Sequence, residues 1–203
     1  MTKRVMAGCV VLLVSAAMAS ANLLTNPGFE TTDTGMPGWD AGGWYIGHDA
    51  DAYSGTNGLA YFVPNGRANG EYYVAFQSVP VTEGLDYDAS MWLRTVSFNT
   101  SEAFMEIVFQ NNTGGWIGQN LTPATTGVTA YTQYSLNALT APAGAVTAMV
   151  RAVIHTTGAT TDNAWYTFDD FSFEAVPEPG TLAMCLMGIG FGAIVMHRRR
   201  RNG

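Results

Sequence analysis

Apolar and polar residues alternate in short runs through the middle of the chain. The clearest runs are residues 59–63, 71–79, 85–94, 103–110, 145–155 and 164–174. Alternation with a period of two is typical of β-strands that bury one face, and turn-forming segments such as PNGRANG and NNTGG separate the runs. No stretch of this region combines the helical period of 3.6 with helix caps. The pattern predicts an all-β domain of about nine or ten strands, arranged as a two-sheet sandwich.

The same alternation assigns a face to each side chain of a strand. The core side of the run 85–94 would hold Leu85, Tyr87, Ala89, Met91 and Leu93. Trp92 and Arg94 fall on the opposite, polar side. An indole on a polar face needs a covering partner, which can be a loop of the protein itself or a bound ligand. The sequence leaves both alternatives open.

The N-terminal end has the pattern of a secretory signal peptide. Lys3 and Arg4 precede an uncharged run over residues 5–18, and small residues stand at Ala19 and Ala21. A core helix would need a polar face, which this run lacks. We therefore expect residues 1–21 to be removed on export, with cleavage after Ala21. The exported region contains no cysteine, so its stability must come from its core, with or without a metal ion.

The C-terminal end has a second targeting pattern. The segment VPEPG at residues 176–180 is followed by 16 apolar or small residues, 181–196, and by four arginines at 198–201. This predicts a single helix that crosses the inner membrane, with the arginines on the cytoplasmic side.

The order of these parts resembles the PEP-CTERM sorting signal of Gram-negative bacteria, here over residues 176–203. The resemblance implies that Pro177, Glu178 and Pro179 mark a segment processed by an exosortase-type enzyme. It also implies a protein that is anchored by its C-terminal helix in transit and then reaches the cell surface or the extracellular matrix, often beside exopolysaccharide. A permanent single-span anchor is the alternative; it accounts for the helix and the arginines but not for the Pro-Glu-Pro.

The charge of the exported region excludes one class of function. Residues 22–176 carry three arginines, no lysine and fifteen carboxylates, a formal net charge of −12. Binding of nucleic acid requires clustered Lys and Arg, so we expect no nucleic-acid partner. An acidic surface suits divalent cations and neutral ligands such as sugars.

Six sequence blocks suggest the kind of sandwich. They are NLLTNPGFE (22–30), GW (38–39), YSGTNGLAYF (53–62), FQSVPVTEGLDYDASMWLR (76–94), TAPAGAVTAMVRAVI (140–154) and WYTFDDFSFE (165–174). Their order resembles that of carbohydrate-binding modules of families four and nine. The resemblance implies a jelly-roll β-sandwich of the galactose-binding-domain type over residues 22–175, with a glycan or exopolysaccharide as partner.

The resemblance also implies a structural calcium ion. In the family, carboxylates at the places of Glu30 and Asp169 help to hold Ca²⁺, and backbone carbonyls complete the shell. Calcium takes six to eight oxygen ligands and tolerates irregular geometry, so the donor type agrees. The alternative is that these carboxylates are simply solvated.

A sugar-binding face needs exposed aromatic rings among polar side chains, because sugars present C–H faces to rings and hydroxyls to polar groups. The candidates are Trp92 and Arg94, Gln77 from the neighbouring strand, and the loop residues Trp44, Tyr45 and Trp116. Each of these aromatic residues could instead fill the core, and Trp39 is expected to do so.

Catalytic motifs are missing from the sequence. There is no G-x-S-x-G, H-E-x-x-H or Walker loop, and neither His48 nor His155 has a triad or ligand spacing. We therefore expect an exported, non-catalytic protein that binds glycan. The competing interpretation is a structural matrix or adhesion protein that binds no sugar.

Overall fold

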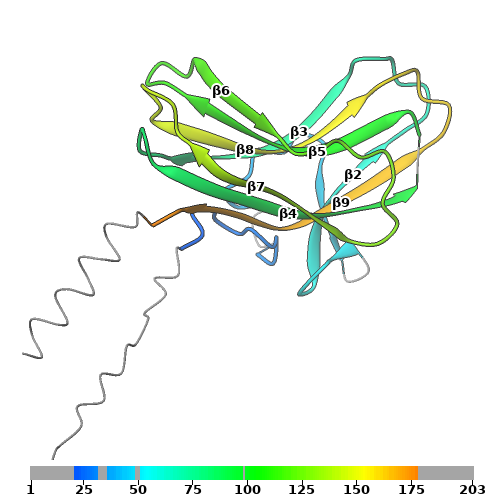
Figure 1. The fold of residues 1–203 in the computed structure, drawn as a ribbon. Helices are drawn as coiled ribbons and strands as arrows, with labels where there is room; N and C mark the ends of the chain where they lie inside the picture. Colours follow the sequence, from blue (N-terminus) through cyan, green and yellow to red (C-terminus); the bar gives the residue numbers. More distant parts are fainter. Residues whose placement is uncertain (1–20, 32–35, 49–50, 98, 178–203) are drawn as a thin grey trace, which may run out of the picture.

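A computed structural model describes residues 21–31, 36–48, 51–97 and 99–177. Within these ranges the protein is all-β, as the alternation predicts (Figure 1). Among the same residues there is no helix with the length and apolarity needed to cross a membrane. The predicted signal peptide up to Ser20 and the predicted membrane helix lie outside the described residues.

In the described part of the chain, nine strands form two antiparallel sheets that pack face to face (Figure 1). The five-stranded sheet runs in the order β1 (Tyr45–His48), β2 (Asn57–Val63), β9 (Ala164–Ala175), β4 (Asp86–Ser97) and β7 (Thr132–Thr140). The four-stranded sheet runs in the order β3 (Tyr72–Pro80), β8 (Thr147–Thr156), β5 (Ser101–Gln110) and β6 (Trp116–Leu121). The predicted sandwich is therefore confirmed.

The six alternating runs correspond to β2, β3, β4, β5, β8 and β9. The three strands without a clear run, β1, β6 and β7, all lie at sheet edges. In β6 and β7 most side chains are exposed or half-buried on both faces. Without one continuously buried face, a strand leaves no period-two pattern in its sequence.

The core lies between the sheets and follows the predicted faces. Tyr87, Ala89, Met91 and Leu93 of β4 are buried, as the alternation predicts. Trp39 is also in the core, as expected.

A bulge interrupts β9 at its middle. Ser90 pairs with Ser172 but Trp92 pairs with Asp169, so β9 holds an extra residue between these positions. Asp170 has φ 45° there, which is typical of a bulged residue. Because of the bulge, Phe168 and Phe171 are both buried. Asp169 and Asp170, which lie between them, then accept hydrogen bonds from Tyr53 N and the Ser54 hydroxyl of the β1–β2 connection.

The N-terminal segment is tied to both sheets. Leu23 N donates to Phe173 O of β9 at 2.9 Å. The side chain of Gln77 on β3 bonds to both backbone groups of Thr25, at 2.6 Å from Thr25 N and 2.9 Å to Thr25 O. One buried amide therefore takes the place of a strand partner for this segment.

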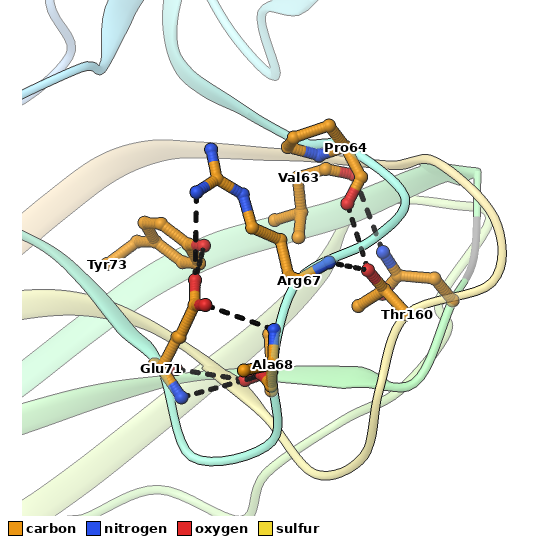
Figure 2. Close-up of polar contacts among 9 residues, drawn as sticks. Val63, Pro64, Arg67, Ala68, Glu71, Tyr73 and Thr160 are labelled. Carbon is orange, nitrogen blue, oxygen red and sulfur yellow. Dashed lines mark hydrogen bonds and ion pairs between the residues drawn. The ribbon is translucent and has the colours of Figure 1, made fainter.

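At the other end of the sandwich, the β2–β3 loop is bonded to the β8–β9 loop (Figure 2). The Thr160 hydroxyl accepts from Arg67 N at 2.8 Å and donates to Pro64 O at 3.0 Å. Glu71 accepts from Ala68 N at 3.0 Å and from the Tyr73 hydroxyl. The hydrogen bond from Tyr73 lowers the pKa of Glu71. These bonds fix the chain immediately before β3 begins at Tyr72.

We expect Gln77→Ala to lower the free energy of unfolding by about 2–3 kcal/mol, because two backbone groups of Thr25 lose their partner. Ser78→Ala is the matched control, since Ser78 is the exposed next residue of the same strand. Urea unfolding of both variants measures the difference. Equal stabilities would show that the N-terminal segment does not depend on the Gln77 amide.

Candidate functional site

The outer face of the four-stranded sheet has a hollow of about 320 Å³. Its lining residues come from all four strands and are Tyr72, Glu106, Trp116, Gln119 and Arg151. Register explains how they meet, since Arg151 of β8 lies opposite Glu106 of β5 and Gln119 of β6 lies opposite Val108.

A buried ion pair forms the floor of this hollow. The Arg151 guanidinium is paired with the Glu106 carboxylate, and the Gln119 amide donates to the other Glu106 oxygen. The Arg151 and Glu106 side chains are only 14% and 5% exposed. Burial of either charge alone would cost several kcal/mol, so each charge requires the other.

Two exposed aromatic rings flank the ion pair. Trp116 is 55% exposed, and its ring lies 5.0 Å from the Arg151 guanidinium carbon in a cation–π contact. Tyr72 is 59% exposed and stacks on the His155 ring at 4.3 Å. His155 Nδ1 lies 3.0 Å from Glu102, which holds the imidazole in place. Both rings are fixed from below and open to solvent above.

This arrangement has the elements that recognise a sugar. An exposed ring can stack on the C–H face of a pyranose, while a carboxylate accepts and a guanidinium and an amide donate hydrogen bonds to hydroxyls. Of the six candidates predicted from the sequence, the hollow contains Trp116 alone.

Trp92 and Arg94 lie on the opposite side of the molecule, on the outer face of the five-stranded sheet. The ring of Tyr53 stacks on Trp92 at 3.8 Å and 12°. Arg94 is paired with Asp51 at 3.4 Å and lies over the Tyr131 ring. The β1–β2 loop therefore covers this face. Of the two possible covering partners for Trp92, a loop of the protein or a bound ligand, the structure shows the loop.

Two other predicted sugar-binding residues need correction. Trp44, expected on an exposed loop, is buried in the core beside Tyr61 and Phe168. Gln77, expected on the strand next to Trp92, is buried in β3 of the other sheet. A period-two pattern does not say which strands are neighbours, which is why the grouping failed. Tyr45 is partly exposed, but it packs on Trp165 at the β1 edge, away from the hollow.

Four lining residues were not predicted from the sequence: Glu106, Arg151, Gln119 and Tyr72. A signal was present for the first two. Glu106 and Arg151 are single charges in the middle of the apolar runs 103–110 and 145–155. A charge inside an otherwise apolar strand requires a partner of opposite sign, and each of these runs supplies one.

Three carboxylates gather around residues 53–57 of the β1–β2 connection. Glu30 accepts from Thr56 N and Asn57 N, each at 3.0 Å. Asp169 accepts from Tyr53 N at 2.7 Å and Ser54 N at 3.1 Å, and Asp170 accepts from the Ser54 hydroxyl at 2.8 Å. Glu30 and Asp169 thus hold the same short segment of the chain.

The electrostatics of Asp169 are unusual. The residue is fully buried, and this desolvation raises its pKa to about 6 against the opposing effect of its backbone N–H donors. A nearby cation would favour the ionised form and lower the pKa.

Among the described residues, no group of three or more His, Cys, Asp or Glu side chains is placed to hold a metal ion. The carboxylate oxygens instead accept backbone N–H groups. Hard oxygen donors suit Ca²⁺, but the calcium site stays a prediction.

Comparison with known proteins identifies a sorting motif and related folds. The PEP-CTERM protein-sorting motif matches residues 175–201, which confirms the sorting signal and indicates an exported protein anchored to the membrane in transit. A comparison with curated proteins found no match.

Solved carbohydrate-binding modules share the fold. A family 61 module, TmCBM61, solved in complex with β-1,4-galactotriose, is 18% identical, with a TM-score of 0.54 over 77% of this chain and 100% of that one. A family 16 module is 18% identical, with a TM-score of 0.52 over 75% of this chain and 99% of that one. The CBM22-1–GH10 modules of Clostridium thermocellum xylanase 10B, solved with xylohexaose, are 18% identical, with a TM-score of 0.53 over 77% of this chain and 29% of that one. The chain thus has the jelly-roll sandwich of these modules, as the sequence resemblance implied.

Asp169→Ala is expected to lower the free energy of unfolding by about 2–3 kcal/mol, because two partly buried backbone N–H groups of the β1–β2 connection lose their acceptor. Ser54→Ala, which removes only the exposed hydrogen bond to Asp170, should cost less than about 1 kcal/mol. Denaturant unfolding compares the two. A smaller loss for Asp169→Ala than for Ser54→Ala would contradict the role of Asp169 in holding this segment.

Proposed function

We propose that this exported protein binds a glycan on the outer face of its four-stranded sheet. Trp116 is the stacking platform, and Glu106, Arg151 and Gln119 bond to the sugar hydroxyls. The observation that carries the proposal is the exposed Trp116 ring, held over a buried ion pair at the edge of a hollow. An exposed indole fixed in this way is costly unless a ligand covers it.

The comparisons support this proposal indirectly. Two of the structures with the same fold were solved with β-1,4-galactotriose and xylohexaose. We infer that the sorting motif delivers the protein to the cell surface or matrix after an exosortase-type enzyme acts at Pro177–Pro179.

We further propose that the protein is not an enzyme. A glycosidase needs two carboxylates across the scissile bond. The described lining of the hollow has one, Glu106, which is ion-paired with Arg151. The competing proposal, a structural matrix or adhesion protein, predicts no saturable sugar binding.

Trp116→Ala should lower the affinity for the recognised glycan at least about tenfold, which corresponds to 1.4 kcal/mol. The screen would use xylohexaose, β-1,4-galactotriose and exopolysaccharide of the producing cell, measured by titration calorimetry or affinity electrophoresis. Trp92→Ala is the matched control, because that ring is covered by Tyr53 on the other face. If a folded wild-type protein binds none of the probes, the structural alternative is favoured. If Trp92→Ala alone abolishes binding, the site lies on the other face.

We also propose that Glu30 and Asp169 bind a structural calcium ion when it is supplied. Calcium should raise the melting temperature and a chelator should reverse the increase, because an ion that binds only the folded state stabilises it. Glu30→Gln should remove the calcium-dependent increment. Glu83→Gln is the control, since Glu83 instead accepts from Gly144 N. An unchanged melting temperature with saturating calcium would exclude the ion.

A further inference from the structure

The outer face of the four-stranded sheet contains a carboxylate–histidine pair beside the hollow. His155 of β8 lies opposite Tyr72 of β3 on one side and opposite Glu102 of β5 on the other. The His155 and Glu102 side chains are partly buried, and His155 Nδ1 lies 3.0 Å from Glu102 Oε1. His155 follows Arg151 by four residues on β8, which is about 13 Å along the strand.

Tyr72 offers a flat aromatic surface at this point. Its ring lies on the His155 imidazole, with 4.3 Å between the centroids and 17° between the planes, yet the residue is 59% exposed. The backbone on both sides of this contact is fixed, because Glu71 N donates to Thr156 Oγ1 at 2.8 Å and Thr156 N donates to Glu71 O at 3.0 Å. One face of the Tyr72 ring is therefore held, and the exposed part can meet a ligand.

An apolar row separates this pair from the ion pair in the floor of the hollow. Between the two pairs, the outer positions of β3, β8 and β5 are Val74, Val153 and Phe104. Val153 and Phe104 are buried, although neither is part of the core cluster between the sheets. Polar pairs on both sides of an apolar strip match a sugar chain, which presents C–H groups on its ring faces and hydroxyls at its edges.

We propose that Tyr72 is a second sugar-stacking ring of this site, with His155 and Glu102 as its positioning residues. The ligand is then an internal stretch of a glycan chain that contacts Trp116 and Tyr72 at once. This inference rests on the proposed glycan site. Trp116 lies against Arg151 and Tyr72 against His155, so the two rings stand at separate points along β8 and serve different sugar units.

The charges around the two rings favour an uncharged chain. Each of the three arginines in the described residues is ion-paired with a carboxylate. An acidic sugar would have to displace one of these carboxylates, in a region whose formal net charge is −12. Neutral hydroxyls avoid this cost, because a paired carboxylate keeps acceptor sites and a paired guanidinium keeps donors.

The first experiment compares long and short probes on the full chain in detergent. The probes are xylohexaose with xylobiose, and β-1,4-galactohexaose with β-1,4-galactobiose. For the series that binds, Tyr72→Ala should lower the affinity for the hexaose about fivefold and leave that for the biose unchanged, whereas Trp116→Ala should weaken both. Tyr45→Ala is the matched control, since Tyr45 is a partly exposed edge tyrosine that packs on Trp165 away from the hollow.

The second experiment tests the positioning of Tyr72. His155→Ala should lower the affinity for the hexaose about threefold, and His155→Phe, which keeps a ring beneath Tyr72, should restore most of it. Glu102→Ala should act in the same direction as His155→Ala. Equal melting temperatures would establish that the variants fold, and a general structural defect would not spare the biose or be rescued by phenylalanine.

The outcomes separate this inference from the proposed function. If a folded wild-type chain binds none of the probes, both are overturned. If binding needs Trp116 but the affinity for the hexaose is unchanged in Tyr72→Ala, only the second ring is overturned. Binding of hexagalacturonate as tightly as the neutral hexaose would overturn the uncharged chain as the ligand.

Discussion

The buried ion pair between Arg151 and Glu106 determines much of the architecture of the outer face. Each charge interrupts an apolar strand, and β8 and β5 are neighbours in the register that places the two side chains opposite each other. Removal of one partner would leave an uncompensated charge, which typically costs about 3–5 kcal/mol. The pair also holds Trp116 through its guanidinium and Gln119 through its carboxylate. Stability and the candidate binding surface therefore depend on the same two residues.

The two outer faces of the sandwich differ in whether their tryptophan is covered. On the five-stranded sheet, the β1–β2 loop lays Tyr53 over Trp92 and pairs Asp51 with Arg94. Carboxylates from both ends of the domain hold that loop by its backbone N–H groups. On the four-stranded sheet the described residues leave Trp116 more than half exposed. The face with its loop cover is structural, and the face without one is where a ligand can stack.

The sequence by itself determined the features that depend on local order. Period-two alternation placed six strands and the buried face of β4. The sorting motif of the C-terminal end is recognised from its residues alone. The tertiary structure decided which outward faces are covered and which strands are neighbours. Gln77 and Trp92 were expected on neighbouring strands but lie in different sheets, and Glu106 and Arg151 are 45 residues apart but in contact. Strand pairing is a long-range property, and edge strands exposed on both faces leave no periodic trace, so the hollow could not be found from alternation alone.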